Sequence, residues 1–157
     1  MGELRALGLF VLVAVGLSAG SAAAADAEDV AAVVRQFGAA VNAADFKSAS
    51  RLLVEDPDIV DEVPPYHWRG PGAPRSWLEA WKAFAGTNAI TDQHMKFADD
   101  MRVEVSGDQA YAVLLGAFSF KIKGATVSET GALGALVTKA ADGWRIKSWT
   151  WAGSKPR

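Results

Sequence analysis

The sequence of 157 residues contains no cysteine and only two histidines, His67 and His94. Without cysteine the chain forms no disulfide bond, thiolate zinc site or cysteine nucleophile, and it carries no lipid on sulfur. With two imidazoles we expect no metal site and no cofactor. Charge of one sign is also scarce, because 16 basic residues face 18 acidic ones for a net charge of −2. Since phosphate backbones are bound by clustered basic residues, we expect no nucleic-acid partner.

Apolar side chains are abundant, at 50% of the sequence, and some of them form a leader-like segment at the N-terminus. Arg5 comes first, residues 6–17 are an uncharged apolar stretch, and residues 18–25 are all small. This order is typical of a secretory signal peptide, with Ala23–Ala25 as a cleavage motif. A retained membrane anchor is the alternative, although glycine and serine dilute the far end of the apolar stretch.

We therefore predict a signal peptide over residues 1–25, with cleavage after Ala25, and a single domain over residues 26–157. The mature protein is expected in the periplasm or outside the cell. After cleavage of the signal we expect no stable association with a membrane.

Behind the leader the chain predicts helices first and strands afterwards. Apolar residues recur at helical spacing near the start and again after a Gly- and Pro-rich loop, whereas alternation and tight turns dominate later. Helices grouped before a meander of strands predict an α+β fold, with the helices on one face of a curved antiparallel sheet. The predicted helices are Asp26–Ala44, a short one opened by Asp45, and Arg75–Ala85; the predicted extended segments are Asp58–Arg69, Gln93–Val105, Ala110–Lys123, Ser128–Lys139 and Trp144–Trp151.

Two turn motifs are the most specific part of the sequence, in Val105–Tyr111 and in Asp142–Trp149. Upstream, Ala44-Asp45 opens a helix and Trp68–Gly70 precedes another. On these motifs the chain resembles the nuclear transport factor 2-like superfamily, in its SnoaL-like and ketosteroid-isomerase-like branch. The resemblance implies a cone, in which the curved sheet wraps the helices around an apolar pocket. Because that superfamily includes isomerases, dehydratases, cyclases and epoxide hydrolases as well as pure binding proteins, the function has to be argued from the site.

The resemblance places a general-base carboxylate at Asp61 or, one residue further on, at Glu62. A shift of one residue exchanges the two faces of a strand, so both candidates stay open. A third alternative is that both acids lie on a solvated edge, in a run with Glu55, Asp56 and Asp58. A carboxylate inside an apolar pocket would have a raised pKa that suits proton transfer.

Other positions that the resemblance marks as catalytic lack the expected groups. The oxyanion tyrosine of ketosteroid isomerases falls on Phe37, which has no hydroxyl to donate. Some SnoaL-like relatives carry histidines on the last strand, where this chain is expected to point Ser148 and Thr150 inward. These two side chains can hydrogen-bond a ligand but cannot act as bases.

Histidines and aromatic side chains complete the predicted site. His67 is expected at the cavity mouth as a proton carrier, with a surface loop as the alternative, and His94 is expected to be exposed. The predicted wall is aromatic, with core packing as the alternative for the tryptophans of the third helix. The predicted wall residues are Phe37, Tyr66, Trp68, Trp77, Trp81, Phe118 and Phe120.

Two tryptophans of the last strand are predicted to face outward. Trp149 and Trp151 share the face of Arg145 and Lys147 in the alternation, and Leu115 lies on the outer face of a neighbouring strand. Large aromatic side chains on an outer sheet face often mark an interface. We therefore predict a homodimer through this face, with isolated exposed aromatics on a monomer as the alternative.

Three functions remain after these steps. The first is a domain that binds a small apolar or aromatic molecule in its cavity. The second is a cofactor-free isomerase or dehydratase-type lyase, in which Asp61 or Glu62 takes a proton and His67 or Tyr66 assists. The third is a dimeric interaction module whose pocket is filled by its own side chains. A cavity of roughly 300 Å³ or more and a carboxylate facing it separate the three.

Overall fold

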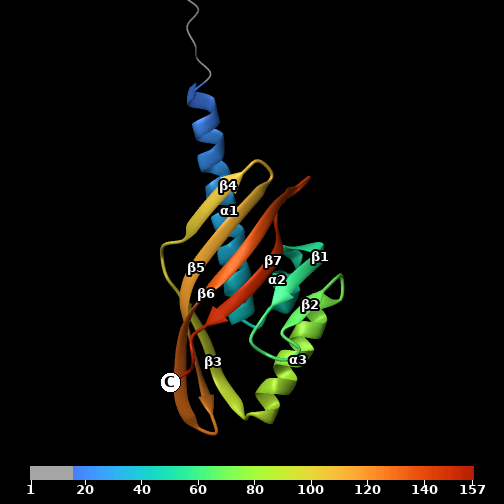
Figure 1. Ribbon diagram of the computed structural model, residues 1–157, viewed down its shortest axis with the longest axis vertical. Helices are drawn as coiled ribbons and strands as arrows, with labels where there is room; N and C mark the ends of the chain where they lie inside the picture. Colours follow the sequence, from blue (N-terminus) through green and yellow to red (C-terminus); the bar gives the residue numbers. More distant parts are fainter. Residues whose placement is uncertain (1–15) are drawn as a thin grey trace, which may run out of the picture.

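The computed structural model describes residues 16–157, in which three helices pack on one curved sheet. The predicted α+β fold is therefore confirmed (Figure 1). Two predicted extended segments each correspond to two strands. A turn separates β1 from β2 within Asp58–Arg69, and a short loop separates β3 from β4 within Gln93–Val105. The elements are α1 (Gly16–Asn42), α2 (Phe46–Arg51), β1 (Leu53–Val60), β2 (His67–Arg69), α3 (Ala73–Thr87), β3 (Ile90–Phe97), β4 (Arg102–Ser106), β5 (Gln109–Ile122), β6 (Ala125–Ala140) and β7 (Gly143–Gly153).

The sheet has the strand order β2-β1-β7-β6-β5-β3, and β4 also pairs with β5. The predicted antiparallel arrangement holds along the meander from β5 to β7, but β1 runs parallel to β7. Hairpin turns fix the direction of neighbouring strands in the meander. Strands β1 and β7 lie far apart in the sequence, so no turn motif between them indicates their relative direction.

Helix α1 lies across one face of the sheet, against β4, β5 and β7. Its apolar stripe of Val30, Val34 and Phe37 is at most 3% exposed. Asp26 of this helix contacts the sheet through polar atoms: its Oδ1 accepts hydrogen bonds from Lys139 Nζ at 2.6 Å and from Trp144 Nε1 at 3.1 Å. Both the stripe and these two bonds fix the helix along the sheet.

The N-terminal end of α1 extends beyond the strands in Figure 1. Residues 22–25 are exposed there. Most of the predicted signal peptide, residues 1–15, lies outside the described residues, so its cleavage stays a prediction. Within residues 16–157, no helix is long and apolar enough to cross a membrane.

The last strand contains a β-bulge at Lys147. Val137 of β6 pairs with Ile146, whereas the preceding residue of β6, Leu136, pairs with Ser148. One residue of β7 therefore has no counterpart on β6. Because side chains alternate between the two faces of a strand, such an extra residue exchanges the faces for everything that follows it.

The bulge reverses the predicted orientation of the end of β7. Trp149 and Trp151 are only 6% and 8% exposed, on the same face as the fully buried Ile146. The prediction that these two tryptophans form an outer dimer face is therefore wrong. The prediction that Ser148 and Thr150 point inward is wrong as well, for the same reason.

Candidate functional site

A cavity of about 540 Å³ lies between the helices and the inner face of the sheet. Helix α1, the end of β1, helix α3 and strands β3, β5, β6 and β7 all contribute to its wall. The volume exceeds the limit set above for a ligand site. The wall is mainly aromatic, with Phe37, Phe46, Trp77, Trp81, Phe84, Phe97, Phe118, Phe120, Trp149 and Trp151.

Asp61 is the carboxylate that the fold turns toward this cavity. It follows β1 and shares the face of Ile59, two residues earlier, which is fully buried. Its Oδ2 accepts a hydrogen bond of 2.6 Å from Trp77 Nε1, and its Oδ1 accepts one of 2.8 Å from the backbone N–H of Glu62. The alternative of a fully solvated edge is therefore wrong for Asp61.

The environment of Asp61 favours its neutral form. Burial raises the pKa of the Asp61 carboxyl group, and the bonds from Trp77 and the Glu62 N–H, which favour the charged form, offset the effect only in part. The negative charge of Glu62 raises the pKa slightly further. The result is a carboxyl group suited to exchange a proton with a bound molecule.

A second acidic feature of the wall is a pair of carboxyl groups, Glu62 and Glu129, from the turn after β1 and from β6. Glu62 Oε1 accepts a hydrogen bond from Gly153 N at 2.8 Å, and Glu129 Oε1 accepts one from Trp151 Nε1 at 2.8 Å. Burial and the charge of Glu129 raise the pKa of Glu62. Both acids predicted as alternatives, Asp61 and Glu62, thus reach the cavity.

Trp149 lies at the centre of the aromatic wall. Its ring packs edge-on against Trp77, with 4.9 Å between ring centres, and in a tilted arrangement against Phe37, with 5.4 Å between ring centres. Its Nε1–H is buried and has no hydrogen-bond acceptor among the described residues. Phe37 stands where the resemblance places a tyrosine, and its ring contributes packing but no hydroxyl.

Of the predicted wall residues, five line the cavity: Phe37, Trp77, Trp81, Phe118 and Phe120. Other predicted wall residues lie elsewhere. Trp68 is buried in the core, Tyr66 is 56% exposed on the turn before β2, and the two polar residues of β7 lie on the opposite face of the strand.

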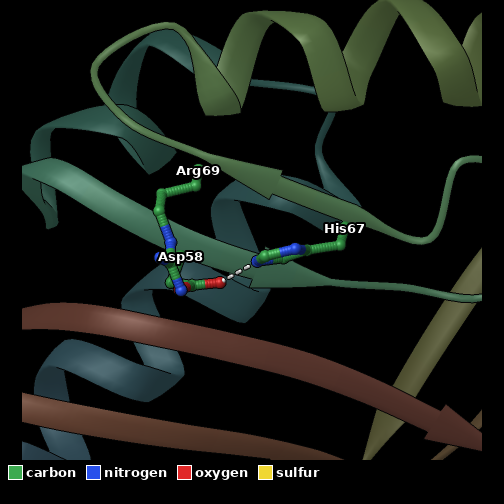
Figure 2. Close-up of polar contacts among 3 residues, drawn as sticks. All are labelled: Asp58, His67 and Arg69. Carbon is green, nitrogen blue, oxygen red and sulfur yellow. Dashed lines mark hydrogen bonds and ion pairs between the residues drawn. The ribbon is translucent and has the colours of Figure 1, made fainter.

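His67 does not line the cavity; it lies on the outer face of β2 (Figure 2). Its Nε2 is 2.6 Å from Asp58 Oδ1 across the β1–β2 hairpin, and Arg69 Nε donates to Asp58 Oδ2 at 3.0 Å. Burial raises the pKa of Asp58, but the bonds from His67 and Arg69 outweigh it, so the pKa is lowered overall. The cluster is a surface ion network, and the neighbouring inward residue is Trp68.

Several wall residues were not identified from the sequence as site residues. His94 is exposed, as predicted, yet it also lines the cavity mouth on β3. Glu129 stands in a strand pattern of small and polar residues, where nothing distinguished it from a solvated acid. Among residues 16–157, no lysine or arginine lines the cavity and no three His, Asp or Glu side chains are grouped to hold a metal ion.

Comparison with known proteins agrees with this geometry. The model of the SnoaL-like domain family matches residues 30–151. None of the curated proteins matches the chain.

Solved structures with the same fold are distant in sequence. A nuclear transport factor 2-like protein with a cystatin-like fold from Novosphingobium aromaticivorans is 19% identical, with a TM-score of 0.70, over 89% of each chain. A candidate scytalone dehydratase from the same organism is 13% identical, with a TM-score of 0.69, over 88% of this chain and 90% of its own. A ketosteroid isomerase-like protein from Erwinia carotovora atroseptica is 16% identical, with a TM-score of 0.66, over 83% of this chain and 98% of its own.

These structures support the fold, and the family match covers most of the chain. The protein belongs to the SnoaL-like domain family, and it shares its fold with nuclear transport factor 2-like and ketosteroid isomerase-like structures.

Proposed function

We propose that the protein binds a small apolar or aromatic molecule in the cavity between α1, α3 and the sheet. The observation that carries the proposal is the open volume of about 540 Å³ behind a mainly aromatic wall. Ligand pockets typically enclose roughly 300–1,000 Å³. An interaction module whose pocket is filled by its own side chains is contradicted by this volume.

Binding of a neutral fluorescent probe, N-phenyl-1-naphthylamine, tests this proposal. The dye brightens when it leaves water for an apolar site, so the wild-type chain should saturate with it. Val41→Trp, on the cavity side of α1, should weaken or abolish the signal because the larger ring occupies the volume. Ala39→Trp, on the exposed side of the same helix, is the control. Equal binding by both variants would refute the proposal.

A second function is favoured by one group, Asp61. A carboxylate in an apolar cavity with a raised pKa is suited to act as a general base without a cofactor. This chemistry corresponds to an isomerase or a dehydratase-type lyase. The names of two structural neighbours, a ketosteroid isomerase-like protein and a candidate scytalone dehydratase, agree with this class.

The base strength of Asp61 can be measured with 5-nitrobenzisoxazole. A general base removes its C3 proton, the electrons of that bond form a nitrile, and the N–O bond breaks to release a phenolate. We expect Asp61→Asn to lower the rate on the order of a hundredfold. Glu55→Gln, an exposed acid on β1, should leave it unchanged. Equal rates for the three chains would remove Asp61 as a base.

We also propose a homodimer through the outer face of the sheet, now without the two tryptophans of β7. Leu115 and Tyr111 of β5 are 57% and 47% exposed on this face. Leu115 pairs with Ala132 of β6, which in turn pairs with Ala152 of β7. Sedimentation should give a dimer for the wild type and a monomer for Leu115→Glu. Ala39→Glu, on the exposed side of α1 and away from this face, is the control.

We propose that the protein is exported, because the sequence predicts a signal peptide and one feature of α1 is consistent with its cleavage. Residues 22–25 are exposed, whereas Asp26 is held by Lys139 and Trp144. Cleavage after Ala25 would therefore leave the contacts of Asp26 with the sheet in place. Expression in a bacterial host followed by intact-mass measurement should find a chain that begins at Asp26 in the periplasm or medium; a full-length cytoplasmic chain would contradict the proposal.

A further inference from the structure

One end of the cavity holds two carboxyl groups that approach the same point. A Cβ atom placed on Gly153 would lie 2.6 Å from Glu62 Oε1 and 2.6 Å from Glu129 Oε1. Only glycine leaves room for both oxygens there. Glu129 is 5% exposed, so one member of the pair is held in the interior.

Among residues 16–157, neither member of this pair forms a salt bridge. Its hydrogen-bond partners are the neutral N–H groups of Gly153 and Trp151. The cavity wall adds a third carboxyl group, Asp61, and no lysine or arginine. Two neighbouring carboxylates repel each other and favour either a shared proton or a bound cation.

The rest of the wall is also suited to a cation. Trp77, Trp81, Trp149 and Trp151 all line the same cavity. The face of an indole ring attracts a positively charged nitrogen, most strongly where water is excluded. A bare metal ion fits less well, since no group of three metal-ligating side chains exists in residues 16–157.

Resting on the binding function proposed above, we infer that the natural ligand carries a positively charged nitrogen, as an amine or quaternary ammonium group, on an apolar body, and that this nitrogen lies at Glu62 and Glu129. The apolar body occupies the aromatic part of the cavity. The two carboxylates thereby select cationic ligands over neutral ones of the same shape.

Two probes of equal shape test the inference on the full chain: benzyltrimethylammonium and its neutral analogue 2,2-dimethylpropylbenzene. Tryptophan fluorescence reports binding of each. We expect the cation to bind at least about tenfold more tightly than the analogue. Glu129→Gln and Glu62→Gln should each remove most of this preference while the affinity for the neutral analogue stays unchanged. Glu55→Gln, outside the cavity, should preserve the preference.

The pH dependence gives a second readout. The titratable side chains of the cavity wall are Asp61, Glu62, Glu129 and His94. Affinity for the cation should rise with pH as the carboxyl pair loses its proton, and affinity for the neutral analogue should not. The rise in affinity with pH should persist in His94→Gln, which removes the one imidazole that lines the cavity among the described residues.

The outcomes test the inference and the proposed binding function separately. If the neutral analogue binds as tightly as the cation, or if the Gln variants weaken both probes equally, the inference is overturned while the proposed binding function stands. If neither of these probes nor N-phenyl-1-naphthylamine binds, both the inference and the proposed function are overturned.

Discussion

The hydrogen bond from Trp77 Nε1 to Asp61 Oδ2, at 2.6 Å, makes the strongest prediction about the site. Trp77→Phe removes this donor and keeps an aromatic ring in the wall. A hydrogen bond to a charged group contributes about 1.5–3 kcal/mol, and each pKa unit corresponds to about 1.4 kcal/mol. Because the bond stabilises the ionised form, the pKa of Asp61 should rise by about one to two units from its already raised value. The pH at which Asp61 becomes an effective base should rise with it.

A carboxyl-carbon NMR titration of Asp61 measures this shift directly. Trp81→Phe is a matched control, because Trp81 lines the same cavity but its Nε1 donates to Gln93, a neutral partner, at 2.9 Å. The control should change the pKa of Asp61 by much less than one unit. An equal shift in both variants would mean that lost packing, rather than the lost bond, controls the carboxyl group. A downward shift in Trp77→Phe would refute the reasoning outright.

Two further predictions concern stability. Gly131→Ala should lower the free energy of unfolding by about 1–3 kcal/mol, because its Cβ would lie 2.6 Å from the Ala152 carbonyl oxygen and 2.7 Å from the Trp151 ring. Gly134→Ala, in the same strand, meets only a Thr150 methyl group at 3.3 Å, and urea denaturation should show a change within about 0.5 kcal/mol; equal losses would contradict the packing argument. Asp58→Asn should cost roughly 0.5–1 kcal/mol at neutral pH. Because the folded-state pKa of Asp58 is lowered, this stability is present above the unfolded pKa of about 3.9 and is lost as the pH falls through the folded value, so wild type and variant should converge in acid; a constant difference would refute it.

Local signals in the sequence were sufficient for the order of the elements. Val30, Val34 and Phe37 predicted the buried stripe of α1, and the turn at Gly143 predicted the β6–β7 hairpin. Long-range pairing was not accessible in this way. The parallel contact of β1 with β7 joins segments at least 90 residues apart, and no local pattern records its direction. That contact brings the end of β1, and with it Asp61, beside the last strand.

The candidate site was predicted least well where the strand alternation is broken. Counting the alternation forward from Trp144 and Ile146 predicts that Ser148 and Thr150 point into the interior. This count is valid only as far as the bulge at Lys147. Beyond the bulge, Trp149 and Trp151 face the helices instead.

This single inserted residue changes the chemistry of the cavity. Without it the end of β7 would present hydroxyl groups to the interior; with it the strand presents two indole rings. Trp151 then donates its Nε1–H to Glu129, and Trp149 packs against the tryptophan that holds Asp61. Bulges are common next to functional sites because they redirect side chains without altering the fold. The bulge is therefore the local feature that turns a generic strand end into part of an acidic, aromatic site.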